Sequence, residues 1–462
     1  MHIILQCIVL AIFTITTHSQ SCLNTSGKEV DWWFILKMPL NSTQKWTGLE
    51  YFYCDSVNNC KEFNLQDDEL SSSTSPLMST IKQINFEDNN FVNMLWSDQP
   101  IKGTTYSSNA HSKGIMSAKL DGDKNAFIIS HSTPRFPKLD DSGKIADDVH
   151  ENFPKYGQHF LCLSTTSDDI NDVLAQMYYQ AEIVIYKVGS TPRSKLFNKD
   201  NYKELDKLWY SKQSGKIGKQ EPYRHRTPYH SHNIFTTRGN QEFSVFSQNQ
   251  KYNQDIYSQL IVKTFNQNLI METWVRKPHG SGLEDAVCNT YETLSNKKVS
   301  FSGKNKSKAI KFEYSYTKDH SKYGITFIKE APSTSRGGSF IATDYSHPSL
   351  KGQIFVSGKN RSKRSLEQED IYQWEEDAGG KTSFDMHVHP EPAATKRKAD
   401  HDESHSPIKK RATDKNKPYV CLSDLNRQQS QWTRGGVVYC FQNEYLWKHL
   451  DKAFVERQDC DS

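Results

Sequence analysis

Two tripeptides with the same three residues, His111-Ser112-Lys113 and His320-Ser321-Lys322, occur far apart in this chain. Two histidines and two lysines can break a phosphodiester bond without a metal ion. One imidazole attacks phosphorus, the other protonates the leaving oxygen, and the two ammonium groups hold the phosphoryl oxygens. Residues i and i+2 of a β-strand point to the same face, so we expect each His and Lys to address one phosphate. Because the chain has 17 histidines, a chance pattern of surface histidines is the alternative interpretation.

The hydrophobic pattern predicts the elements that must position these tripeptides. Apolar runs predict buried strands over residues 30–36 and 126–130, and residues 111–116 fit a third strand. Helical spacing of apolar residues predicts helices over residues 168–186, 255–269 and 443–455. The only internal duplication is the distant pair of tripeptides, which suggests two similar halves that face each other across a shared site.

The composition indicates a folded body with at least one polar insert. The chain has 462 residues, enough for one large domain or two medium ones. Only 35% of the residues are hydrophobic, which is low for a globular protein, whereas 12% are aromatic, which excludes a wholly disordered chain. The net charge of +4 permits nucleic-acid binding but does not by itself indicate it.

The N-terminus predicts export from the cell. Residues 3–15 are almost unbroken apolar but too few to span a bilayer, and small residues precede Gln20, so we expect a signal peptide over residues 1–19. No later stretch is apolar enough to cross a membrane. Removing the signal leaves eight cysteines, an even number that suggests disulfides in an oxidising compartment. Four glycosylation sequons fit that compartment: Asn24, Asn41, Asn305 and Asn360.

Residues 359–417 differ in composition from the rest of the chain. Acidic residues come first and basic ones follow, with too few apolar residues to offset the entropy of ordering, so we expect a disordered charged insert. Two basic clusters between Lys396 and Arg411 have the spacing of a bipartite nuclear localisation signal, which would make nuclear import machinery a partner. A solvated charge run in a loop is the alternative. Export and nuclear import are compatible if the protein is delivered to the nucleus of another cell.

Further segments surround both tripeptides in a fixed order. They are Lys37-Met38-Pro39, Trp96-Ser97-Asp98-Gln99-Pro100, His111-Ser112-Lys113-Gly114, His131-Ser132-Thr133-Pro134-Arg135-Phe136-Pro137, Tyr156-Gly157-Gln158, Asp319-His320-Ser321-Lys322-Tyr323, Asp424-Leu425-Asn426-Arg427 and Arg434-Gly435-Gly436. In this order they closely resemble the deoxyribonuclease II family, acid endonucleases of lysosomes and of some animal secretions. The resemblance covers nearly the whole chain outside the signal and the insert, and it is weakest from about residue 165 to 250.

The resemblance implies a fold and a division of the chain. The implied fold is α/β with mixed sheets, a phospholipase-D-like pseudodimer in which two similar halves each supply one His-x-Lys motif. On this basis we expect an N-terminal half over residues 20–170. We expect a C-terminal half over residues 171–358, which residues 418–462 complete after the insert.

The resemblance also implies an activity and its residues. The activity is metal-independent and cofactor-independent hydrolysis of DNA at acid pH through a phosphohistidine, which leaves 3′-phosphate and 5′-hydroxyl ends. The implied catalytic residues are His111, Lys113, His131, His320, Lys322 and Asn426. Histidine titrates near pH 6.5, so an acid optimum follows if the proton donor must be charged. The residues leave open which histidine attacks; our working hypothesis takes His111 as the nucleophile and His320 as the acid.

The cysteine pattern of the family suggests three disulfides, and we pair the two remaining cysteines locally. The pairs are Cys22–Cys162, Cys288–Cys460, Cys421–Cys440 and, as the local pair, Cys54–Cys60. Three departures from the family pattern are visible. Tyr323-Gly324 replaces a Trp-Cys, the acid after the first motif (Asp121) is more distant, and the insert after the second motif is longer.

Alternative functions belong to other classes. The expected partner is a DNA substrate, and the expected location is outside the cell, with the lysosome or a host nucleus as alternatives. A catalytically inactive secreted relative that binds DNA or a host partner is the alternative function, although such a relative would usually have lost a motif residue and this chain retains all four. A lipid phosphodiesterase would share the chemistry, but the surrounding residues favour the nuclease.

Overall fold

The computed structural model describes residues 20–101, 105–120, 125–180, 183–191, 227–275, 283–306, 308–328 and 417–460. Several expectations fall outside these residues: the signal peptide, Asp121, the sequon at Asn360, and the insert up to residue 416, which includes the basic clusters between Lys396 and Arg411. In the part of the chain that is described, no helix is long and apolar enough to cross a membrane.

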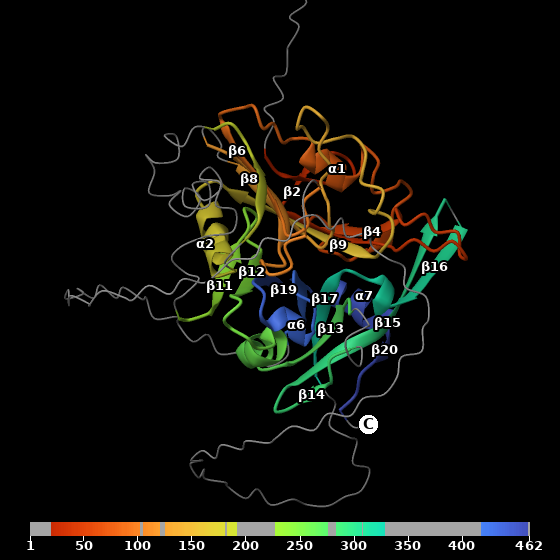
Figure 1. The fold of residues 1–462 in the computed structure, drawn as a ribbon. Coiled ribbons are helices and arrows are strands. Elements are labelled where there is room, and N and C mark those ends of the chain that lie inside the picture. The colour runs from red at the N-terminus through yellow and green to blue at the C-terminus, as the bar shows by residue number, and fades with distance from the viewer. Residues whose placement is uncertain are drawn as a thin grey trace, which may run out of the picture. The chain divides into compact units, whose positions relative to one another are not determined.

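An eight-stranded antiparallel sheet forms the framework of the N-terminal part (Figure 1). Its strand order is β10-β6-β7-β8-β9-β3-β4-β5. The strands are β3 (Trp32–Lys37), β4 (Tyr51–Asp55), β5 (Asn64–Leu65), β6 (Phe91–Ser97), β7 (Lys113–Lys119), β8 (Asn125–His131), β9 (Gln158–Thr166) and β10 (Ile185–Val188). The short strands β1 (Cys22–Leu23) and β2 (Glu29–Val30) pair separately, and helix α1 (Pro76–Ile81) begins at the N-cap Ser75, whose side chain accepts from the Met78 amide.

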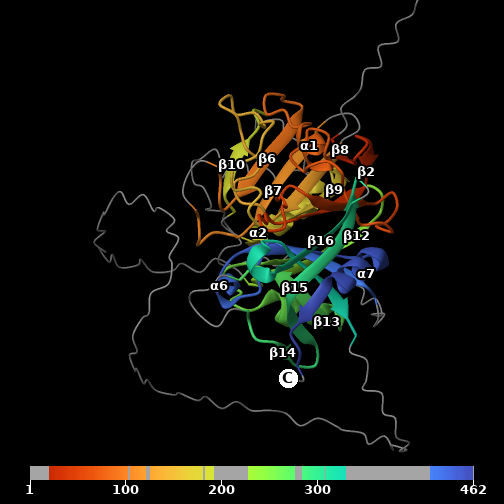
Figure 2. The same cartoon turned by 90° about the vertical axis from the view of Figure 1, so that its right-hand side faces the viewer.

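A larger mixed sheet forms the framework of the C-terminal part. Its main order is β11-β12-β19-β18-β17-β13-β15-β14, and only the β13–β15 pair is parallel. Figure 2 shows the long hairpin of β15 and β16. The strands are β11 (His230–Thr236), β12 (Glu242–Gln248), β13 (Asn268–Thr273), β14 (Val287–Cys288), β15 (Glu292–Asn305), β16 (Lys308–Ser315), β17 (Lys322–Phe327), β18 (Tyr419–Ser423), β19 (Gly436–Gln442) and β20 (Phe454–Arg457).

The two sheets share one hydrophobic core. Along β3, alternate side chains point to opposite faces: Trp32 and Phe34 enter this shared core, whereas Trp33 packs on the other side with residues of α1. Trp32 meets Phe441 of β19 edge to face, with ring centroids 5.2 Å apart. Because both faces of β3 are covered, its residues from Trp32 to Leu36 are continuously apolar and do not alternate with polar ones. The shared core fixes the two sheets against each other, and each tripeptide ends at the first residue of an interior strand, β7 or β17.

Helices are few among the described residues, and two of them differ from expectation. The helix expected over residues 168–186 is α2 (Ile170–Gln180), and the last two residues of that range, Ile185 and Tyr186, belong to β10 instead. The expected helix 255–269 is a π-helical turn, η3 (Tyr257–Ile261), followed by α5 (Val262–Phe265), and residue 268 already begins β13. The helix expected over residues 443–455 is α7 (Glu444–Ala453), capped by the Asn443 side chain. The remaining short helices are η4 (Tyr316–Lys318) and α6 (Gln429–Trp432).

Four disulfides cross-link the described residues, and they are the pairs named from the sequence: Cys22–Cys162, Cys54–Cys60, Cys288–Cys460 and Cys421–Cys440. Two of them close loops of 140 and 172 residues, and these two constrain the unfolded chain most.

The sheet of the N-terminal part extends beyond residue 170, where we expected the N-terminal half to end, because β10 pairs with β6.

Candidate active site

The two tripeptides occupy the same place relative to their strands. Lys113 is the first residue of β7, and Lys322 is the first residue of β17. His111 and His320 lie two residues earlier, outside the strands, so the expectation that both members of each pair lie on a strand is wrong for the histidines. The loop before each strand positions the imidazole, while the sheet fixes the lysine.

Backbone hydrogen bonds join each motif to the opposite half of the chain. The Gly157 amide donates to Lys318 O (2.8 Å), and the His320 amide donates to Gly157 O (2.9 Å). The His111 amide donates to Gly435 O (2.8 Å). Each histidine is therefore held by a residue that is distant in sequence, and neither half-site is complete without the other half of the chain.

Lys113 lies in a buried ion-pair network centred on Asp98. Its Nζ donates to Asp98 Oδ1 at 2.6 Å, and Arg434 donates to Asp98 Oδ2 at 2.8 Å. Arg434 follows the second half-site in sequence, whereas Asp98 directly follows β6. Asp98, Lys113 and Arg434 are all buried, so the carboxylate and both cations are shielded from water, and the pairing fixes the position of the Lys113 ammonium.

His111 has a defined tautomer. Its Nδ1 lies 2.7 Å from Asp424 O, and a carbonyl oxygen can only accept, so Nδ1 carries the proton. In the neutral ring, Nε2 then holds a lone pair. Burial lowers the pKa of His111 well below its ordinary value, and Lys113, Arg434 and Lys322 lower it further. His111 is thus a neutral imidazole with a free electron pair on Nε2.

His320 lies between two aromatic rings. The Tyr156 ring stacks on it with a centroid distance of 3.8 Å, and the Trp274 ring lies 4.2 Å away at a tilt of 54°. Its Nε2 is buried without a hydrogen-bond partner among the described groups. Burial lowers the pKa of His320 well below its ordinary value, and the positive charges of Lys322 and Lys113 lower it further. The ring is held in a fixed plane while Nε2 stays available.

The two motifs are coupled electrostatically. Lys322 of the second motif lowers the pKa of His111, and Lys113 of the first motif lowers the pKa of His320. Lys322 Nζ donates to His320 O at 2.6 Å. Burial lowers the pKa of Lys322 to about 7, with a further contribution from Lys113. Each histidine therefore lies within the field of the lysine from the other motif.

Two further histidines lie behind the motif lysines. His159, whose role the sequence did not indicate, accepts from the Lys322 amide through Nδ1 at 3.1 Å and is fully buried. His131 ends β8 and packs against Phe136 and Phe160, and neither of its ring nitrogens bonds to another described side chain. The pKa of His131 is lowered to about 3, mainly by burial and to a smaller extent by the positive charge of Lys113. His131 is therefore a neutral, buried neighbour of the first motif, without a described contact to His111.

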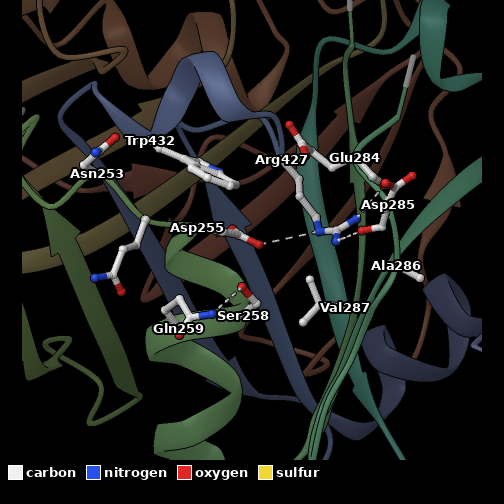
Figure 3. A pocket seen from close by; sticks show the side chains of 11 residues that line it. Asn253, Asp255, Ser258, Gln259, Glu284, Asp285, Ala286, Val287, Arg427 and Trp432 are labelled. Atoms are coloured by element: carbon white, nitrogen blue, oxygen red, sulfur yellow. Dashed lines mark hydrogen bonds and ion pairs between the residues drawn. The ribbon is translucent and has the colours of Figure 1, made fainter. Parts of the chain in front are cut away.

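Asn426 and Arg427 differ in their surroundings. The Asn426 side chain is buried, its Oδ1 has no partner among the described groups, and no described contact joins it to either motif histidine. Arg427 lines a cavity of about 440 Å³ (Figure 3), where it bonds to Ser295 Oγ (2.6 Å) and pairs with Asp255 (3.7 Å). This cavity contains neither motif. Arg427 instead anchors the loop after β18 to β13 and β15, because its amide also donates to Thr273 Oγ1.

Four residues of the site were not predicted from the sequence, although the sequence carried a signal for them. Asp98, Asp424, Tyr156 and Arg434 all lie in segments that carried the family resemblance, but the contacts they make span hundreds of residues and cannot be inferred from spacing. Within the described part of the chain, no three His, Cys, Asp or Glu side chains are arranged to hold a metal ion.

A family model for deoxyribonuclease II matches residues 21–339 and 342–460. The chain belongs to the deoxyribonuclease II family. It is a deoxyribonuclease II-like nuclease, a hydrolase of phosphodiester bonds, with the mixed α/β, phospholipase-D-like fold of this family.

Named relatives agree with this membership. Deoxyribonuclease-2-alpha of Rattus norvegicus is 26% identical over 72% of this chain and 92% of its own length. Plancitoxin-1 of Acanthaster planci is 25% identical over 69% of this chain and 82% of its own length. Cell-death-related nuclease 7 of Caenorhabditis elegans is 21% identical over 98% of this chain and 91% of its own length. This member of the family has two His-x-Lys motifs, and the lysine of each motif lowers the pKa of the histidine of the other.

Proposed function

We propose that this deoxyribonuclease II cuts DNA at acid pH without a metal ion, through a covalent phosphohistidine on His111. The observation that carries the proposal is the hydrogen bond from His111 Nδ1 to Asp424 O, because it fixes the lone pair on Nε2. Nε2 attacks the phosphorus of a phosphodiester, and an N–P bond forms as the bond from phosphorus to the 5′ oxygen breaks. The fragment on the 5′ side of the cut remains attached to the enzyme through its 3′-phosphate.

His320 supplies the proton for the leaving 5′ oxygen. Its unpartnered Nε2 and its fixed ring plane suit a donor that must meet one atom of the substrate. In the second step a water attacks phosphorus and gives a proton to the neutral His320. The N–P bond breaks, His111 regains its lone pair, and a 3′-phosphate is released. The 5′-hydroxyl product leaves after the first step.

The lysines replace a metal ion as the source of positive charge. Lys113 and Lys322 flank the coupled histidines from two sheets and stabilise the charge on the non-bridging oxygens. Lys322 has a pKa of about 7 because it is buried, so it carries its full charge only below neutral pH. An acid medium thus favours the charged forms of both the proton donor His320 and the phosphate-binding Lys322. His131 and Asn426 remain expected contributors, with His131 supporting Lys113 from behind.

Plasmid nicking tests this function. At about pH 5 in EDTA, the full chain should convert supercoiled DNA to nicked circles, and the new 5′-hydroxyl ends should accept label from polynucleotide kinase without prior phosphatase treatment. His320→Ala should lose this activity. Cleavage that requires added Mg²⁺, or ends that need phosphatase before labelling, would contradict the proposal. An inactive DNA-binding relative, the alternative function, would bind DNA at pH 5 and leave it intact.

The location that fits this chemistry is acidic or extracellular. We propose export through the signal peptide over residues 1–19, and the four disulfides support passage through an oxidising compartment. A mature protein in the culture medium that begins at Gln20 is the expected result of expression in animal cells. Retention in lysosomes is the alternative, and delivery to a foreign nucleus through Lys396–Arg411 is tested by a fluorescent fusion of residues 359–417. Diffuse fluorescence would exclude nuclear import.

A further inference from the structure

The two halves of the site each contain a Ser-Asp pair in the same position. Ser97 ends β6, the neighbour of β7, and Ser423 ends β18, the neighbour of β17. In both, the serine Oγ accepts from the amide two residues on, that of Gln99 at 3.1 Å and that of Leu425 at 3.0 Å. Asp98 and Asp424 follow the serines and are both buried. The fold therefore places one carboxyl beside each motif strand in the same local turn.

The two carboxyls have different partners. Asp98 is bonded to the ammonium of Lys113 and the guanidinium of Arg434, so its negative charge is compensated. Asp424 is 2% exposed, and no ion pair joins its carboxyl to a lysine or arginine of the described chain. Neither of its oxygens lies in good hydrogen-bond geometry with another described group, although the Ser112 hydroxyl faces the carboxyl.

Charged and titratable groups from several elements surround Asp424. Burial raises the pKa of its carboxyl to about 7, Lys113 and Lys322 oppose the rise, and Asp98 adds to it. The charge of Asp424 also acts on the phenols of Tyr439 and Tyr257. Both phenols are neutral because burial raises their pKa values strongly. Asp424 therefore faces the same two ammonium groups that the proposed function assigns to the phosphate.

We propose that Asp424 is a substrate-binding acid, whose neutral carboxyl donates a hydrogen bond to a non-bridging oxygen of the DNA phosphodiester and whose ionised carboxylate excludes that phosphate. The inference rests on the proposed function and deepens it, because it adds a third cause of acid dependence, besides protonation of His320 and of Lys322. An anionic carboxylate next to an anionic phosphate repels it. DNA binding and protonation of Asp424 are then linked, and each favours the other.

A binding experiment separates this effect from catalysis. The full chain with His320→Ala, alone and combined with Asp424→Asn, is titrated with a labelled oligonucleotide duplex between pH 5 and pH 8 by fluorescence anisotropy. One pH unit above a pKa near 7, about a tenth of the carboxyls are protonated. The Asp424→Asn combination should therefore bind on the order of tenfold more tightly at pH 8 than His320→Ala alone, and equally at pH 5.

Two controls make the outcome decisive. Asp424→Glu keeps a titratable carboxyl and should keep the loss of affinity with rising pH, whereas Asp424→Ser, a second neutral variant, should remove it even if the Asn variant folds poorly. Asp98→Asn, the matched change in the other half, should weaken binding at every pH without removing its pH dependence. Melting curves at pH 5 confirm folding.

An effect of Asp424 through Lys322 would change the DNA affinity at pH 8 in the opposite direction. That outcome would contradict the inference. Asp424 raises the pKa of Lys322, so its neutralisation lets Lys322 lose charge at lower pH. If Lys322 alone governs the affinity, the Asn variant binds more weakly at pH 8. That result, or parallel curves for the two proteins, overturns the inference while leaving the proposed function intact. If the His320→Ala protein does not bind DNA at pH 5, both fail together.

Discussion

At the scale of single residues, burial and neighbouring cations keep both motif histidines neutral in the free protein. A neutral imidazole suits the nucleophile His111, but the donor His320 must gain a proton. The lowered pKa of His320 means that its charged form is lost early as the pH rises, and a bound phosphate opposes this by adding negative charge. We therefore expect kcat to fall as pH rises from the acid range.

Lys155 gives a direct test of this sign. Burial is the largest cause of the lowered pKa of His320, and the positive charges of the buried lysines lower it further. The exposed Lys155 also lowers it. Lys155→Gln should move the alkaline limb of the kcat–pH profile upward by about a few tenths of a pH unit, less at high salt because the charge is exposed. Lys28→Gln, another exposed lysine, should leave the limb in place. A downward shift for Lys155→Gln would contradict the assignment of His320 as the acid.

Lys37 positions His320 indirectly, through Tyr156. Its fully buried ammonium donates to Gly48 O at 2.9 Å and to Tyr156 O at 2.6 Å, and Tyr156 stacks on His320. Lys37→Met leaves these carbonyls unpaired, so unfolding by urea should require about 2–4 kcal/mol less, and kcat should fall because the His320 ring loosens. The exposed control Lys28→Met should change neither quantity. Unchanged stability and kcat in Lys37→Met would remove this role.

At the scale of elements, close backbone contacts between the halves bring the two motifs together. Gly435 O accepts from the His111 amide, and a Cβ on Gly435 would lie 1.7 Å from Gln180 O, the end of α2. Since a backbone atom cannot rotate away, this position requires glycine. The loop before β7 is thus held by the loop before β19.

Gly435→Ala should therefore move the His111 loop. We expect a stability loss of about 1–3 kcal/mol and a fall in kcat on the order of tenfold or more, measured by urea unfolding and by cleavage at pH 5. Gly189→Ala is the control, because its nearest atom would lie at 3.3 Å and a small shift accommodates it. Equal behaviour of the two variants would show that the Gly435 contact does not position His111.

Element types were predictable where one rule governed the segment. The strand at Trp32–Lys37 and the helix at Glu444–Ala453 follow from apolar continuity and helical spacing. The expected helix over 168–186 was too long because apolar residues continue past Gln180, and only pairing of Ile185–Val188 with β6 makes them a strand. The π-helical turn at Tyr257–Ile261 was invisible because its apolar spacing still fits a helix.

The site was predictable only in part, for a related reason. The His-x-Lys pattern singled out four residues that the fold brings into one electrostatic cluster. Asp98, Asp424 and His159 were not singled out, because their roles depend on contacts with residues far away in sequence, such as the bond between His111 and Asp424. Spacing identifies residues that act together locally, whereas these contacts exist only after both sheets pack on their shared core.

At the scale of the whole molecule, the account requires one catalytic centre built from two halves. The shared core, the bonds that join each motif to the opposite half, and the mutual electrostatic coupling of the motifs all favour one centre over two independent ones. In one centre His111 and His320 act on the same phosphate in sequence, so the loss of either stops the reaction. In two independent centres each would work alone.

The most direct measurement is a double-mutant cycle of cleavage rates at pH 5 in EDTA with His111→Ala, His320→Ala and the double variant. For residues that act as a unit, each single change should lower kcat/KM on the order of a thousandfold or more, and the double variant should be no worse than the poorer single variant. Single variants that each retain about half of the activity, with loss only in the double variant, would contradict a shared centre.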